Sequence, residues 1–330
     1  MSKYQPSPVE QPVVDQPNVT PSVIQPTGAV QYPPVRAVLD PDNPQWADPP
    51  WLGAAKAFIM WLASVACLLL LPLVLVLPYV IHKVIISHQA AFGDLLNDKT
   101  FLLLNVLGVI PAHVVTFAIA YLVVTSSRRF PFRKTLGFSW PPSWKTFIFS
   151  SPNWPESFTT FKGVIICSLI GGALFGVGAL ITQLFPGQKT DLDVLIESSY
   201  GARVVTAFLA VATAPLVEEV VYRGMLYPGL NRIIGAGPSI ALVSLLFAGV
   251  HFLQYKNNLA VIVVITLVSV TLTTVRALTH RLLPSFVIHL VFNGIQALIF
   301  LVAPFLTRFQ EPTPHPAPAA LLALVLKHLF

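Results

Sequence analysis

Hydrophobic positions in this chain fall into long runs separated by short polar connections. A run of about 20 apolar residues is long enough, as a helix, to cross a hydrocarbon core roughly 30 Å thick. Seven runs of this kind or slightly shorter occupy residues 54–81, 101–125, 163–184, 204–222, 238–253, 259–278 and 283–306. The pattern therefore predicts an all-α fold, a polytopic integral membrane helical bundle.

A further apolar stretch, residues 317–330, lies near the end of the chain. It is shorter than a full crossing requires, so we expect an interfacial helix or a partial eighth span. The prediction is thus about seven to eight transmembrane helices. Composition agrees, because 55% of residues are hydrophobic and 10% are charged, whereas soluble domains carry roughly a quarter charged residues.

Four regions are predicted along the chain. Residues 1–50 are rich in Pro, Gln and Val and are expected to form a disordered leader. Residues 51–160 hold two spans and a basic loop rich in Trp and Pro, residues 161–306 hold the remaining spans, and residues 307–330 form a tail with a short apolar helix. Within the third region, Gly172 and Gly176 form a small-xxx-small pair, which predicts close helix packing at these two positions.

The distribution of Lys and Arg predicts orientation. Residues 126–162 carry six Lys or Arg and one acid, whereas residues 186–202 carry one Lys and three acids. Because basic residues concentrate in cytoplasmic loops, we expect the first segment and the amino terminus in the cytoplasm, with the chain crossing the cell (inner or plasma) membrane. The net charge of +6 is explained by this topology and gives no argument for nucleic acid.

Two adjacent carboxylates interrupt the apolar pattern. Of the 14 acidic residues, only Glu218 and Glu219 lie within an apolar run. A charge at the centre of a span costs roughly 2.5–3.5 kcal/mol on insertion scales, so such groups indicate function. Glu219 lies four residues before Arg223 on one helix face, which predicts an ion pair. Glu218 points about 100° away and has no obvious neighbour in its own helix. A desolvated carboxyl of this kind suits a general base that takes a proton from water.

Two later runs each carry a polar pair at the same four-residue spacing. Phe247 and His251 share one helix face, and so do His289 and Asn293. Three apolar helices therefore present polar groups that are able to converge. His113, which stands alone in its run, is interpreted as a buried core residue.

Together, Glu218-Glu219-x-x-x-Arg223, Phe247-x-x-x-His251 and His289-x-x-x-Asn293 resemble the three-motif pattern of the CPBP family of intramembrane proteases. This family includes the type II CAAX prenyl endopeptidases and the Abi, or bacteriocin-processing, proteins. The resemblance covers residues 204–306 and implies that residues 161–306 form the catalytic core of an endopeptidase. The implied roles are a general base, Glu218, with His251 beside it; oxyanion donors, His289 and Asn293; and residues that orient the site or contact the substrate, Glu219 and Arg223.

The residues leave several alternatives open. Glu218, His251 and His289 are candidate zinc ligands, although no HExxH motif is present, and a water activated by glutamate without metal serves equally well. The same polar groups suit a proton- or cation-coupled transporter, or a non-catalytic scaffold or immunity protein. The expected partners are the lipid bilayer and a peptide or membrane-protein substrate, either prenylated or bacteriocin-like.

Overall fold

A computed structural model of the chain describes residues 48–88, 91–126, 130–141 and 156–308. The described residues form helices and contain no strand, so the all-α prediction is confirmed. Most of the leader, most of the Trp/Pro-rich loop and the predicted helix at residues 317–330 lie outside the described residues.

The helices follow one another in this order: α2 (Pro50–Val80), η2 (Ile81–Ile86), η3 (Phe92–Asn97), α3 (Lys99–Val124), α4 (Phe132–Thr135), α5 (Glu156–Leu184), α6 (Asp191–Ser198), α7 (Tyr200–Phe208), η4 (Leu209–Thr213), α8 (Ala214–Glu218), η5 (Glu219–Leu226), α9 (Tyr227–Ile234), α10 (Ala236–Tyr255), α11 (Leu259–Thr279) and α12 (Leu282–Arg308).

Within the described residues, six helical stretches are long and apolar enough to cross a membrane: Pro50–Ile86, Lys99–Val124, Thr160–Leu184, Tyr200–Ile234, Leu259–Thr279 and Leu282–Leu306. Six of the seven predicted runs correspond to these stretches. The remaining run, residues 238–253, falls in α10, whose apolar part is shorter than a full crossing. The polytopic helical bundle is therefore confirmed, with α10 as its short member.

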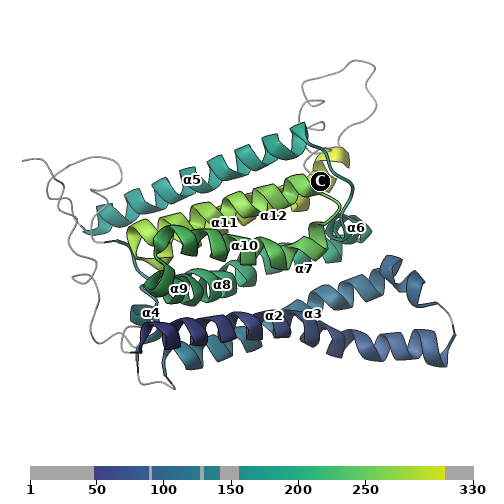
Figure 1. Cartoon of the computed structure of the whole chain (residues 1–330). Helices are drawn as coiled ribbons and strands as arrows, with labels where there is room; N and C mark the ends of the chain where they lie inside the picture. Colours follow the sequence, from purple (N-terminus) through teal and green to yellow (C-terminus); the bar gives the residue numbers. More distant parts are fainter. Residues whose placement is uncertain (1–47, 89–90, 127–129, 142–155, 309–330) are drawn as a thin grey trace, which may run out of the picture. The chain divides into compact units, whose positions relative to one another are not determined.

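Helices α2 and α3 form an antiparallel hairpin (Figure 1). They approach closely where Gly108 of α3 meets Pro72 of α2, because glycine has no side chain. A Cβ at position 108 would overlap that proline. Asp98 caps the start of α3, accepts a hydrogen bond from the Tyr79 hydroxyl and pairs with Lys83. This polar cluster joins the two helices at the connection between them.

Helix α5 packs against α11 and α12 through two glycines that differ from the predicted pair. A Cβ at Gly171 would lie 2.9 Å from the Ile288 carbonyl oxygen, and one at Gly178 would lie 2.9 Å from Val264. Among the described residues, no atom outside the local helix backbone lies within 4 Å of a Cβ built at Gly172 or Gly176. The prediction that Gly172 and Gly176 mediate close packing is wrong, because the face that meets α11 and α12 is the one carrying Gly171.

The fourth span, residues 200–234, is a helix interrupted by two wide turns, η4 and η5. In η4 the Ala214 N–H donates to the Leu209 carbonyl, five residues back. The next N–H in this register would serve Ala210, but position 215 is a proline and has none. The Ala210 carbonyl is therefore available to another helix. Wide turns of this kind often occur at functional sites.

Candidate active site

The first contact of the site is the ion pair within the fourth span. Nη1 of Arg223 lies 3.0 Å from Oε1 of Glu219, and both side chains are fully buried. The pair predicted from the four-residue spacing is confirmed. Because removing one partner would leave an uncompensated buried charge, the two residues hold each other in place.

His289 of α12 lies between the two glutamates. Its Nδ1 lies 3.1 Å from Oε1 of Glu219, and its Nε2 lies 3.6 Å from Oε2 of Glu218. A carboxylate only accepts hydrogen bonds, so the Nδ1–H of His289 donates to Glu219. The Glu218 side chain is 20% exposed whereas that of Glu219 is not exposed at all. Glu218 is thus the partly exposed carboxylate of the pair.

Phe247 of α10 packs in the middle of this network. The guanidinium carbon of Arg223 lies 4.8 Å from the centre of the Phe247 ring, a cation–π distance. The ring also contacts the rings of His251 and His289, with centroids 4.8 and 6.3 Å away. Phe247 therefore links the Glu219–Arg223 pair to both histidines.

His251 is fixed by its own helix. Its Nδ1 lies 2.9 Å from the carbonyl oxygen of Phe247, so Nδ1–H is the donor and neutral His251 keeps Nε2 as a hydrogen-bond acceptor. The shared face predicted for Phe247 and His251 is confirmed by this bond and by the contact between their rings.

Asn293 reaches the first wide turn of the fourth span. Its Nδ2 donates to the Ala210 carbonyl at 2.9 Å, which is the carbonyl that Pro215 leaves without a helical partner. His289, one turn earlier on α12, contacts Glu219 near the second wide turn. The shared face predicted for His289 and Asn293 is confirmed, and α12 therefore binds the fourth span at both interruptions.

The structure brings four of the six predicted residues into one connected network: Glu218, Glu219, Arg223 and His289. His251 joins the network through Phe247, whereas Asn293 hydrogen-bonds to the backbone of η4. His113, interpreted as a core residue, is buried and its Nδ1 lies 2.8 Å from the Thr213 hydroxyl. The geometry combines an accessible carboxylate, two imidazoles, an amide and a buried ion pair.

The comparison with protein families gives one match. The family described as type II CAAX prenyl endopeptidase Rce1-like matches residues 200–295. The chain carries an Rce1-like domain. The match covers less than a third of the chain, but all six predicted site residues lie inside it. No curated protein and no solved structure gives a match. The match supports a CAAX-type intramembrane protease, and the six long apolar helices among the described residues are consistent with a multi-pass membrane protein.

Two residues of the Rce1-like domain that contact Arg223 were not predicted from the sequence. Ser269 and Thr273 of α11 both accept hydrogen bonds from its guanidinium. Their four-residue spacing in an apolar helix was the available signal, because it places two hydroxyls on one face. The signal is weak, since hydroxyls in apolar helices commonly bond to their own backbone.

The side chains of the Rce1-like domain are not arranged to bind zinc in this structure. Within the described part of the chain, no three His, Cys, Asp or Glu side chains come together in a way that would hold a metal ion. Both ring nitrogens of His289 face carboxylates, and Nδ1 of His251 is used by the Phe247 carbonyl. The candidate set of Glu218, His251 and His289 therefore does not form a ligand cluster here, and no step is derived through a metal.

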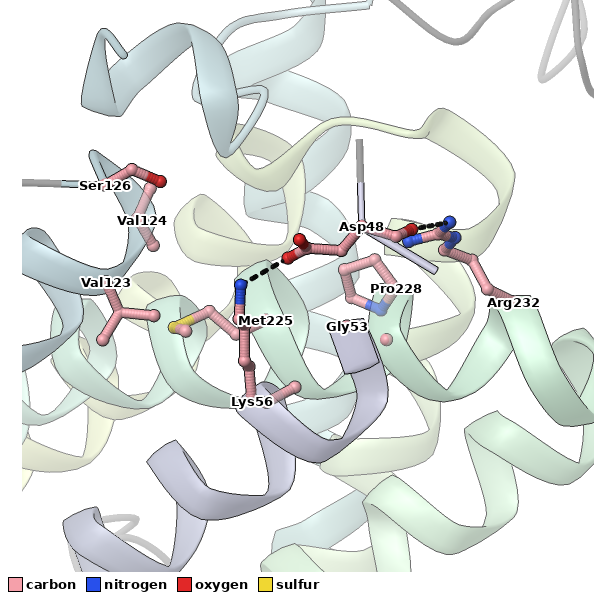
Figure 2. A pocket seen from close by; sticks show the side chains of 11 residues that line it. Asp48, Gly53, Lys56, Val123, Val124, Ser126, Met225, Pro228 and Arg232 are labelled. Atoms are coloured by element: carbon pink, nitrogen blue, oxygen red, sulfur yellow. Dashed lines mark hydrogen bonds and ion pairs between the residues drawn. The ribbon is translucent and has the colours of Figure 1, made fainter. Parts of the chain in front are cut away.

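A small pocket of about 70 Å³ lies beyond the Rce1-like site, where α2 and α3 meet η5 and α9 (Figure 2). Met225 and Pro228 form part of its apolar wall. At its rim the carboxylate of Asp48 pairs with Lys56 at 2.6 Å, and the Asp48 carbonyl accepts from Arg232 at 2.7 Å. None of the six predicted site residues lines it, so the candidate active site is distinct from this pocket.

Proposed function

We propose that the Rce1-like domain is an intramembrane endopeptidase that hydrolyses peptide bonds with a water activated by Glu218. The observation that supports this is a partly exposed carboxylate beside a buried Glu219–Arg223–His289 network. An ion pair that only stabilised the fold would need one carboxylate for its arginine. The second carboxylate raises the cost of insertion, and a catalytic role accounts for its presence.

Glu218 acts as the general base in this proposal. It takes a proton from water while the water oxygen bonds to the carbonyl carbon of the substrate, and that carbonyl oxygen becomes an oxyanion. The proton then passes to the amide nitrogen as the carbon–nitrogen bond breaks. In this proposal His251 assists Glu218 by accepting a hydrogen bond from the water at its Nε2. Its Nδ1–H is not available for this, because it donates to the Phe247 carbonyl.

His289 and Asn293 stabilise the oxyanion. One amide N–H of Asn293 is held by Ala210, which fixes the side chain and leaves its second N–H for the substrate. When His289 is protonated on both nitrogens, Nδ1–H stays on Glu219 and Nε2–H is the second donor. Losing one such donor costs about 2.7–4 kcal/mol of transition-state stabilisation in known enzymes.

The proposed substrates are peptide segments that reach a site within the membrane. The name of the matched family makes a prenylated peptide ending in a CAAX box the first substrate to test, with a bacteriocin-like precursor as the second. The proposal places the chain in the cell membrane with its amino terminus and the opening of the site in the cytoplasm.

The test is cleavage of quenched fluorescent peptides, prenylated and unprenylated, by purified protein in proteoliposomes. Glu218→Gln keeps the size of the side chain but removes the base, so we expect the rate to fall by at least about 10². Glu197→Gln is the matched control, because Glu197 pairs with Lys189 at the surface and should leave the rate unchanged. A Glu218→Gln protein that cleaves at the parent rate contradicts the proposal and favours a transporter, which ion flux in the same proteoliposomes would detect.

A further inference from the structure

Arg223 is bound by a helix that contributes to none of the three sequence motifs. Its Nε donates to the Thr273 hydroxyl at 3.2 Å, and its Nη2 donates to the hydroxyl and the carbonyl of Ser269 at 2.7 and 3.2 Å. All three residues are fully buried. Helix α11 therefore supplies three acceptors to one edge of the guanidinium.

The two hydroxyls are oriented to accept. Thr273 Oγ1 donates its own proton to the Ser269 carbonyl at 2.7 Å, so a lone pair is left for Nε of Arg223. Thr271 provides a contrast on the same helix, since its hydroxyl makes the same type of bond, to the Leu267 carbonyl at 2.9 Å, and makes no hydrogen bond to a site residue among the described residues.

The remaining surfaces of Arg223 face the catalytic motifs. Its Nη1 binds Oε1 of Glu219, and its guanidinium carbon lies 4.8 Å from the centre of the Phe247 ring. The same Oε1 atom accepts the Nδ1–H of His289, whose Nε2 faces Glu218. A continuous chain of contacts thus runs from α11 through Arg223, Glu219 and His289 to the proposed base.

We propose that Ser269 and Thr273 are positioning residues for the peptidase site, acting through Arg223 to fix Glu219 and His289. The inference rests on the proposed function and extends it. Without the two hydroxyls, the guanidinium keeps its charge but loses two of the three acceptors that α11 provides, and only the Ser269 carbonyl remains. Glu219 and His289 would then be held less firmly in one arrangement relative to Glu218, although the fold would remain.

Kinetics of substitutions on α11 provide the test. Thr273→Val and the double variant Ser269→Ala/Thr273→Val should lower kcat about 10- to 100-fold with KM changed less than about twofold, because misplacement near 1 Å is enough for such losses. Thr273→Ser restores the hydroxyl and should return kcat to near the parent value. Thr271→Val, the matched control, should leave kcat and KM unchanged.

Thermal unfolding of each variant, measured in the same detergent, separates positioning from folding. A loss of kcat that Thr273→Ser rescues and Thr271→Val does not reproduce supports the inference. Thr273→Val at the parent kcat, or equal losses in Thr273→Val and Thr271→Val, overturns it. Glu218→Gln is assayed alongside, because retained cleavage there defeats the proposed function itself, whereas an inactive Glu218→Gln with a fully active Thr273→Val defeats only the role of α11.

Discussion

At the residue scale, His289 connects the two glutamates of the site. Its two ring nitrogens lie 3.1 and 3.6 Å from Glu219 and Glu218 respectively. Glu219 is also committed to Arg223 and is fully buried. The two adjacent glutamates therefore have different environments. Of the two, Glu218 is partly exposed and has the His289 imidazole as a neighbour, whereas Glu219 is fully buried.

The buried ion pair leads to a prediction about stability. Glu219→Gln and Arg223→Ala each leave one uncompensated buried charge, so each should destabilise the protein by roughly 3–5 kcal/mol. The double variant removes both charges and should lose much less than the sum. Denaturant titration in mixed micelles measures the three values.

The exposed pair of Lys189 and Glu197 is the control for that cycle. Its side chains are 62% and 50% exposed, so its removal should change stability by no more than about 1 kcal/mol. Additive losses at Glu219 and Arg223 would show that the two residues act independently, contrary to the contact between them.

Metal removal gives a second prediction at this scale. Because Glu218, His251 and His289 do not form a three-ligand cluster in the described structure, we expect peptide cleavage to survive exhaustive chelation, with elemental analysis confirming that the treated protein contains no stoichiometric metal. Loss of turnover that added Zn²⁺ restores would contradict this expectation. It would also indicate that Glu218, His251 and His289 rearrange to bind the ion.

Pairs within one helix were predictable from the sequence, whereas partners between helices were not. The spacing of Glu219 and Arg223, or of Phe247 and His251, fixes their relative direction through the helical repeat. The contact of Arg223 with Ser269 and that of Asn293 with Ala210 depend on how separate helices pack. No local pattern encodes that packing, so the sequence alone could not identify these partners.

At the element scale, the interruption of the fourth span creates a hydrogen bond between two helices. In lipid, a backbone carbonyl needs a partner within the protein. Pro215 removes one such partner, and Asn293 supplies the replacement from α12. The interruption thus creates a specific anchor between two helices that carry site residues. The proline was visible in the sequence, but the wide turn and its partner were not.

Helix α5 gives the prediction that belongs to this scale. Gly171→Ala places a methyl group 2.9 Å from both the Ile288 carbonyl oxygen and Cβ of Val291, closer than side chains approach without a shift of α12. We expect a loss of stability of about 1–3 kcal/mol, as overpacking usually gives. Thermal unfolding of the purified protein measures it.

Gly172→Ala is the matched control, because among the described residues its added Cβ meets no atom outside the local helix backbone within 4 Å. A methyl group there should be neutral or slightly stabilising, since alanine is the better helix former. Equal losses at both positions would contradict the assignment of the packed face. Sequence spacing identified the glycine-rich segment but not which of its faces packs, since adjacent positions differ by only 100°.

At the scale of the whole molecule, several connections between helices gather at one end of the bundle. Arg232 at the end of α9 binds the Asp48 carbonyl just before α2, and the Leu282 N–H at the start of α12 donates to Gly137 in the connection between α3 and α5. Ser126, the first residue of the basic segment, lines the same pocket as Arg232 and Asp48, so the end of α3 lies at this end of the bundle too. Six of the seven predicted runs are long enough to span, as hydropathy predicted, whereas residues 238–253 fall in α10, whose apolar part is too short for a full crossing.

Orientation in the membrane is the prediction that follows from this shared end. If residues 126–162 are cytoplasmic, the α9–α10 connection near Gly235 must be cytoplasmic too, and residues 186–202 must lie outside. A reporter active only outside the cytoplasm should be silent when fused after position 145 or after Gly235, and active when fused after Lys189. Silence at 145 and 235 together with activity at 189 also checks that α5 and the fourth span both cross, because position 189 lies between them. Activity at 145 and 235 with silence at 189 would reverse the topology, and the proposed site would then receive its peptides from outside the cytoplasm.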